Sequence, residues 1–205
     1  MNTVPTSNNQ KYLFTGKRQT VGEVTLWQIE RCSDRELGGW LESSDNLSPD
    51  GTCWVGADAI VMNNASITES AVVTDRAIVS ENAMVSGRAE ISGGFISGYA
   101  SVSGSASVSG SVRIEGNARV SGGTVSGTAE VKDYAKITGG DVSGGYIGGH
   151  AHVSGGEISA DDYNHLTSVH GSAVVSGGEI RGGEIHGHAR IEDRATVTGG
   201  NISGG

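Results

Sequence analysis

The chain contains six histidines, and all of them lie between His150 and His188. This cluster is the strongest chemical signal in the sequence, because a neutral imidazole can act as a general base and can bind zinc. Two pairs, His150/His152 and His186/His188, are each separated by a single residue, a spacing expected for exposed positions beside a strand or corner. Surface histidines that form no site are therefore the simplest interpretation. Whether the imidazoles converge depends on the elements that carry them.

The histidines lie within a repeat. From Val55 to Ile202 an aliphatic residue returns every five or six positions, with one longer gap between Ile158 and Val169. An alanine commonly follows four positions after this anchor, as in Val102-Ser103-Gly104-Ser105-Ala106. β-Branched anchors and glycine suit short strands joined by tight corners, whereas a helix would need spacings near three and four. The pattern therefore predicts a repeat solenoid.

The anchors also predict the size of the solenoid. If each coil takes three anchors and the gap between Ile158 and Val169 contains one weak rung, the chain forms about nine coils, which at a strand spacing of about 4.8 Å gives a prism on the order of 43 Å long. Where a Gly-Gly pair replaces the alanine, as at Gly93-Gly94, the spacing falls to five residues. We expect a tightened corner at each such pair, with the anchors continuing on both sides.

The hexads resemble the hexapeptide-repeat family over roughly residues 54–205. This resemblance implies an all-β fold, the single-stranded left-handed parallel β-helix, in which three short strands form each triangular coil. The segments Gly38-Gly39-Trp40-Leu41-Glu42 and Gly51-Thr52-Cys53-Trp54-Val55 are also similar to the first part of YdcK-like bacterial and phage-encoded members.

Residues 1–53 do not follow the five- or six-residue pattern of the repeat. Residues 1–10 are polar and are predicted to be a flexible N-terminus. Tyr12-Leu13-Phe14 and the segment from Val21 to Ile29 are typical of two strands in a hairpin, so residues 11–53 are predicted to form a small N-terminal β cap. Such a cap closes the open end of a solenoid. Residues 54–205 then form the predicted β-helix, with a loop interruption at 159–168.

Side chains next to an inward anchor point outward, so those on every third rung are expected to form columns. One predicted hydroxyl column contains Thr74, Ser92, Ser109, Ser126, Ser143, Ser159 and Ser176. A second predicted column contains Thr68, Ser86, Ser103, Ser121, Thr138, Ser154, His170, His186 and Ser203. These columns indicate either a plain solvated surface or a recognition surface for a protein or a glycan.

The remaining face is predicted to be apolar. Its outward side chains include Ile60, Ile78, Phe95 and Tyr146. An exposed apolar patch usually has a partner, so we expect either the N-terminal cap or another subunit to cover it.

The resemblance also offers chemistry for the histidines. Hexapeptide acyltransferases use a histidine as general base beside a loop between coils, so His165 and His170 are the candidate catalytic residues, with Asp161 or Asp162 as orienting groups. The γ-class carbonic anhydrases share the implied fold and bind zinc through three histidines, so His165, His170 and His186 are the comparable metal candidates. The long acceptor loop and C-terminal helical segment typical of the transferases have no counterpart here. We therefore expect neither a cofactor nor a metal.

The charge argues against one class of partner. The formal net charge is −9, and lysine and arginine do not cluster in the sequence, so we expect no direct binding of nucleic acid. Glu157, Glu179 and Glu184 each precede an anchor, so the C-terminal half has an acidic surface. An alternative is therefore an acidic rod that mimics nucleic acid and inhibits a host defence enzyme.

Two further observations concern location. Cys32 and Cys53 lack the paired spacing of a zinc site and are interpreted as reduced thiols. The N-terminus has no basic region followed by an apolar stretch, and no run approaches the roughly 18 apolar residues that cross a bilayer. We expect a cytoplasmic protein without membrane contact, or a virion-associated one if a phage encodes it.

The leading hypothesis is a non-enzymatic, rigid β-helical interaction or structural module. It would bind another protein through its flat faces or its open C-terminal end. A homo-oligomer is expected, and the resemblance suggests a trimer. The alternatives are an acyl-CoA-dependent acyltransferase with a histidine base and the acidic nucleic-acid mimic.

Overall fold

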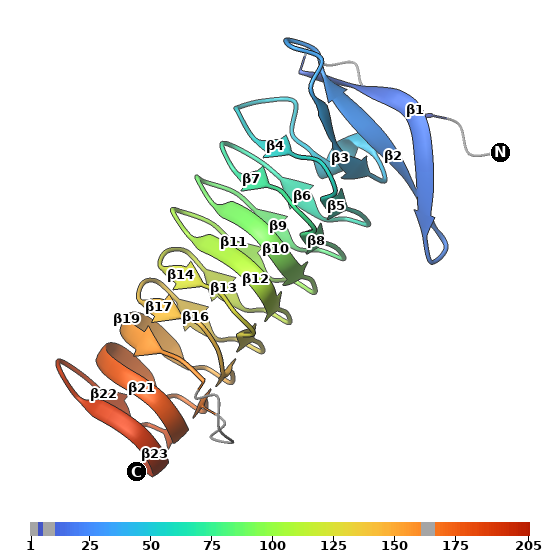
Figure 1. The fold of residues 1–205 in the computed structure, drawn as a ribbon. Coiled ribbons are helices and arrows are strands. Elements are labelled where there is room, and N and C mark those ends of the chain that lie inside the picture. The colour runs from blue at the N-terminus through green and yellow to red at the C-terminus, as the bar shows by residue number, and fades with distance from the viewer. Residues whose placement is uncertain (1–3, 6–10, 161–166) are drawn as a thin grey trace.

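The computed structural model describes residues 4–5, 11–160 and 167–205, and this part of the chain is all-β apart from one short 3-10 turn. Figure 1 shows an elongated stack of coils with an antiparallel hairpin at its N-terminal end. Most of the predicted flexible N-terminus lies outside the described residues, as do Asp161, Asp162 and His165. Within the described ranges, no helix has the length and apolar character required to cross a bilayer.

Three antiparallel strands form the N-terminal cap: β1 (Tyr12–Val21), β2 (Val24–Arg31) and β3 (Leu37–Leu41). β3 also pairs in parallel with β5 (Ile60–Val61), so it is both the last strand of the cap and the first rung of the solenoid. The 3-10 turn η1 (Ser44–Asn46) follows β3. The cap closes the first coil with fully buried side chains, namely Tyr12, Ile29, Leu41 and Leu47.

The solenoid strands pair in parallel with the coils before and after them and align in three columns, here called faces 1, 2 and 3. Face 1 contains β4 (Trp54–Val55), β7 (Val72–Val73), β14 (Thr124–Val125) and β17 (Asp141–Val142). Face 2 contains β5, β8 (Ile78–Val79), β15 (Glu130–Val131), β18 (Tyr146–Ile147) and β20 (Ser168–Val169). Face 3 contains β6 (Ser66–Ile67), β9 (Met84–Val85), β11 (Ser101–Val102), β13 (Arg119–Val120), β16 (Lys136–Ile137) and β22 (Arg190–Ile191).

Longer strands continue around a corner and contribute to two or three faces. They are β10 (Glu90–Ile96), β12 (Ser107–Ile114), β19 (His152–Ile158), β21 (Val174–Gly187) and β23 (Thr196–Gly204). The result is a parallel β-solenoid of about nine turns, which confirms the predicted fold class. The winding sense stays a prediction of the resemblance.

The core is a narrow stack of one large and one small side chain per typical rung. Val102 and Ala106 illustrate the pattern, because both are essentially inaccessible to solvent. Backbone hydrogen bonds join the coils directly: Trp54 N donates to Ala71 O at 3.0 Å, and Val72 N donates to Ala89 O at 2.9 Å. Burial and hydrogen bonding are therefore repeated along the stack, so stability is distributed over the coils.

At the corner between faces 2 and 3, side chains also connect successive coils. The Asn63 Oδ1 atom accepts from Glu81 N at 3.3 Å, and Glu81 Oε2 accepts from Gly98 N at 2.8 Å. Asp133 Oδ2 accepts from Gly149 N at 2.9 Å in the same way. Each contact satisfies a corner N–H of the next coil, a group that would otherwise depend on water.

The prediction of a weak rung between Ile158 and Val169 was wrong. Ile158 pairs with Val142 on face 1, and Val169 pairs with Ile147 on face 2. These are consecutive rungs on adjacent faces, so the interruption replaces a corner and the register leaves no place for a further rung. Anchor counting failed here because a long corner and a missing rung give the same gap.

The predicted tightened corners are confirmed at Gly93-Gly94. Both residues have positive φ, +128° and +82°, a region that favours glycine. Parallel pairing continues on both sides, with Ile91 opposite Val108 and Ile96 opposite Ile114.

Val108→Asp is expected to prevent folding, because Val108 is completely buried in the apolar stack and a carboxylate there would lose its hydration. Ser107→Asp is the matched control, since Ser107 precedes Val108 in β12 and is partly exposed. Circular dichroism melting should show a cooperative transition near the wild-type temperature for Ser107→Asp only. A Val108→Asp protein with an unchanged melting temperature would refute the inward register.

Gly104→Ala is expected to destabilise the protein by more than Gly22→Ala. Both glycines have similar positive φ, +62° and +59°, so alanine meets the same backbone strain of about 1–2 kcal/mol at each. A Cβ atom at Gly104 would in addition collide with the carbonyl oxygen of Ser121 on the next coil, whereas Gly22 faces open space. Denaturant unfolding measures the difference, and equal losses would contradict the close stacking of the corners.

Candidate functional site

Two of the candidate histidines, His170 and His186, lie on face 2 near its C-terminal end. His170 and His186 follow the paired residues Val169 and Ile185, and their rings stack with centroids 5.5 Å apart and planes within 10°. The two histidines therefore occupy neighbouring coils of one column, as predicted. His165, the other catalytic candidate, lies outside the described residues.

A hydrogen-bond network fixes both rings. His170 Nε2 lies 2.8 Å from Glu184 Oε1, and His186 Nε2 lies 2.7 Å from Asn201 Oδ1. Asn201 Nδ2 donates to Glu184 Oε2 at 3.1 Å, so Glu184 and Asn201 connect the two histidines. Both Nε2 atoms thus face oxygen atoms of this network.

Within the described residues, this arrangement orients the two imidazole rings through their Nε2 atoms. Among residues 4–5, 11–160 and 167–205 no group of three potential metal ligands comes together. His170 and His186 direct their Nε2 atoms at Glu184 and Asn201, so the three-histidine comparison receives no support from the described geometry.

The first predicted hydroxyl column lies on face 1 from Thr74 to Ser159. Its members follow the paired anchors Val73, Ile91, Val108, Val125, Val142 and Ile158. The extension to Ser176 was wrong, because Ile158 pairs with Ile180, whereas Val175 pairs with Val153 on face 3. Ser176 therefore continues the second column, after Ser154.

The same error gave the wrong face for three predicted members of that second column. His170, His186 and Ser203 follow anchors of face 2, and His186 lies opposite Ser203 there. The wrong assignment followed from the extra rung assumed between Ile158 and Val169, which shifted every later residue by one face.

The apolar patch is a column on face 2. Trp40, Ile60, Ile78 and Phe95 occupy successive rungs and pair in register. Phe95 is 49% exposed, whereas Trp40, Ile60 and Ile78 are partly buried. From β1, the Lys17 ammonium lies 5.6 Å from the centroid of the Trp40 ring, so a second strand of the cap contacts the N-terminal end of the column.

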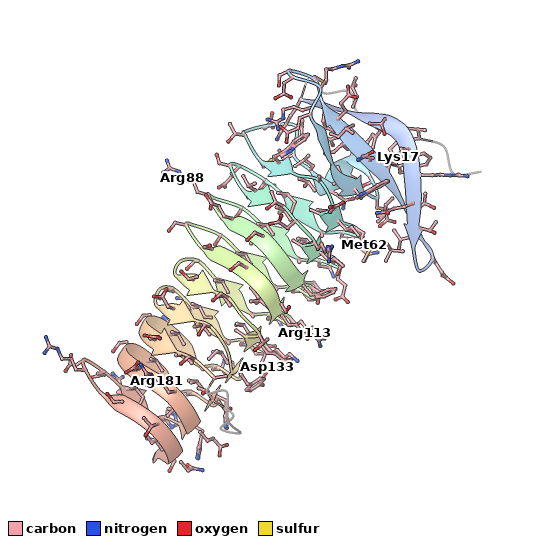
Figure 2. The ribbon with its side chains drawn as sticks, in the orientation of Figure 1. Lys17, Met62, Arg88, Arg113, Asp133 and Arg181 are labelled. Atoms are coloured by element: carbon pink, nitrogen blue, oxygen red, sulfur yellow. The ribbon has the colours of Figure 1, made fainter. Side chains whose placement is uncertain are left out.

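Figure 2 shows how outward side chains distribute around the stack, with Met62, Arg113 and Asp133 on one side and Arg88 on the other. Met62 follows Val61 on face 2, beside the apolar column, and Arg113 occupies the rung after Phe95. The apolar column therefore ends at a cation.

A hollow of about 610 Å³ opens beside Phe95. It forms where the short corner Gly93-Gly94 lies between two longer corners, and its charged lining residues are Asp58, Asp75 and Arg76. These three residues are not among the candidates predicted from the sequence. The signal that marks the place is a shortened Gly-Gly corner directly before an outward aromatic residue.

Tyr146 lies on face 2 as predicted, two rungs beyond Arg113, and Glu130 occupies the rung between them. The Tyr146 hydroxyl donates to Asp133 Oδ2 at 2.8 Å, across the position of Gly148. The Gly149 N–H and the Tyr146 hydroxyl lower the pKa of Asp133, because they stabilise its carboxylate. The same bond to Asp133 raises the pKa of the Tyr146 phenol, because it stabilises the protonated form.

Asp133→Asn should therefore lower the pKa of the Tyr146 phenol toward its ordinary value. Gly148→Ala should do the same without changing a charge, because a Cβ atom there would collide with the Tyr146 hydroxyl and displace the ring. Ultraviolet titration, with Tyr146→Phe as the reference that removes this phenol, measures the effect. Since the folded pKa is raised, this contact stabilises the protein below the ordinary phenol pKa and is lost as the pH rises through the folded value. An unchanged titration in both variants would refute the hydrogen bond.

Comparison with models of known protein families finds no match to this chain, and no curated protein matches it. The hexapeptide-repeat resemblance therefore stays a prediction from the repeat itself.

Proposed function

We propose that this chain is a non-enzymatic, rigid interaction module that binds a protein partner through the apolar column of face 2. The observation that carries the proposal is the continuous outward stack Trp40, Ile60, Ile78 and Phe95, which ends beside the hollow at Gly93-Gly94. Single exposed apolar side chains are ordinary, whereas a contiguous apolar surface is typical of a protein interface.

The solenoid holds this column in place. Each residue of the column precedes a completely or almost completely buried anchor, namely Leu41, Val61, Val79 and Ile96. Inter-coil hydrogen bonds such as Ile60 N to Ala77 O at 2.9 Å fix the rungs relative to each other. A preorganised surface loses little conformational entropy on binding, so a modest apolar area can still give specific affinity.

The hollow adds a chemical preference. Its lining combines the apolar Ile78 and Phe95 with the carboxylates of Asp58 and Asp75 and the guanidinium of Arg76. This set favours a partner segment that presents an apolar side chain next to a basic group, because the apolar group would bury Phe95 while the basic group meets the two carboxylates.

Acyl transfer at His170 and nucleic-acid mimicry stay predictions without an observation of their own. A bacterial or phage origin, and a place in the cytoplasm or the virion, likewise rest on the sequence resemblance and composition.

Phe95→Ser is expected to abolish partner capture. Tagged wild-type protein, Phe95→Ser and the control Tyr99→Ser would be used to capture proteins from bacterial lysate, followed by quantitative mass spectrometry. Tyr99 suits the control because it is 68% exposed and lies four positions away at a corner, outside the column.

A protein retained by the wild type and by Tyr99→Ser, but reduced at least tenfold with Phe95→Ser, would support the proposal. Equal capture by all three, or no protein retained by the wild type, would count against it. Melting curves of the three proteins must coincide for the comparison to hold.

A further inference from the structure

Two outward columns on different faces carry charges of opposite sign. On face 3, Arg119, Lys136 and His152 each precede an anchor on three successive coils, and they pair in register. The neighbouring column at these rungs consists of hydroxyls, Ser121, Thr138 and Ser154. Thr138 Oγ1 lies 3.2 Å from His152 Nε2. Across the described residues, neither Arg119 nor Lys136 forms an ion pair within 4.0 Å.

Face 1 has the opposite sign. Asp141, Glu157 and Glu179 precede anchors on three successive coils and also pair in register. Glu179 forms an ion pair with Arg181, whereas Asp141 and Glu157 have no ion pair in the part of the chain that the structure describes. Ser143 and Ser159 continue the hydroxyl column beside Asp141 and Glu157.

Both columns place like charges one strand spacing apart, about 4.8 Å, where they repel. A surface of opposite charge would relieve this repulsion in each case. The two columns match each other in spacing because both inherit it from the same stack of coils. The two surfaces are also similar in shape, since small hydroxyl side chains flank the charges on both faces.

We propose that face 3 of one copy binds face 1 of a second copy, with Arg119 and Lys136 opposite Asp141 and Glu157. This surface is separate from the apolar column of face 2, so the inference does not depend on the proposed function. Two different faces meet, which makes the contact heterologous, and a pair keeps one unoccupied face of each sign, face 1 on one copy and face 3 on the other. The assembly therefore extends beyond a dimer.

Because the area available for contact is small, the stability of the interface depends on its charges. A rung of about six residues at about 3.3 Å each keeps the width of a face under about 20 Å. Arg119 and Lys136 lie two coils before Asp141 and Glu157 in the stack, so their pairing offsets the two copies and the overlap is shorter than the full length of about 43 Å. The contact therefore buries less than about 800 Å² per copy. Stable interfaces bury about 800 Å² per partner. An interface below this size, without a large apolar centre, depends on its ion pairs and weakens with salt.

Sedimentation equilibrium of the full chain tests the proposal with two charge-reversed variants. The first, Arg119→Glu/Lys136→Glu, makes face 3 acidic, and the second, Asp141→Lys/Glu157→Lys, makes face 1 basic. Arg18→Glu/Arg113→Glu is the control for total charge, because Arg18 lies in the cap and Arg113 lies on face 2. All three residue pairs are exposed, so each variant should melt near the wild-type temperature.

We expect the wild type and the control to self-associate at low salt and to become monomeric in about 0.5 M NaCl. Each face variant alone should bind itself at least tenfold more weakly than the wild type. An equimolar mixture of the two should associate again, because one then carries two acidic faces and the other two basic faces. A wild type that is monomeric at every concentration, association that salt leaves unchanged, or a mixture that stays monomeric would overturn the proposal.

Discussion

The parallel register of successive coils is the constraint on which the rest of this structure depends. Backbone N–H groups of one coil donate to carbonyl groups of the next, as from Trp54 N to Ala71 O, and the pairing joins residues at equivalent positions of the repeat. The position of a residue in the hexad therefore determines which side chains lie above and below it in the stack. Any residue type that recurs at one position becomes a column on the surface, and the three faces acquire separate characters from a repeat that looks uniform in sequence.

The same register restricts what the interior and the corners can contain. The core admits one anchor and one small residue per typical rung, so alanine occupies most corners of full length, with Val112 as an exception. Close coil spacing leaves no room for a Cβ atom at corner glycines such as Gly104. Charged and aromatic side chains are thus confined to outward positions, where they follow the spacing of the strands. The contacts between Asp133, Tyr146 and Gly149 show that outward side chains also connect neighbouring coils.

The architecture was predictable from the sequence because its signal repeats. The anchors from Val55 to Ile158 were assigned to the correct faces, and the hydroxyl column was correct as far as Ser159. The assignment failed after the interruption, since the length of a corner is not encoded in the anchors that flank it. The pairing of Tyr146 with Asp133 was also missed, because it joins an outward strand residue to a corner of the preceding coil.

Much of the candidate surface became visible only once the register was known. The basic column of Arg119, Lys136 and His152 consists of residues spaced 17 and 16 positions apart in a chain of net charge −9, so neither composition nor local charge density marks it. The hollow beside Phe95 likewise depends on a short corner meeting longer ones on adjacent coils.

The corner between Ile158 and Val169 has a consequence for how such a chain can change over time. The rungs on both sides keep their partners, Val142 and Ile180 for Ile158, and Ile147 and Ile185 for Val169. Added length at a corner thus carries mainly the cost of loop closure, which rises only slowly with the number of residues. The faces and the corners can evolve independently: substitutions alter a column, while insertions add sequence at an edge without disturbing any column.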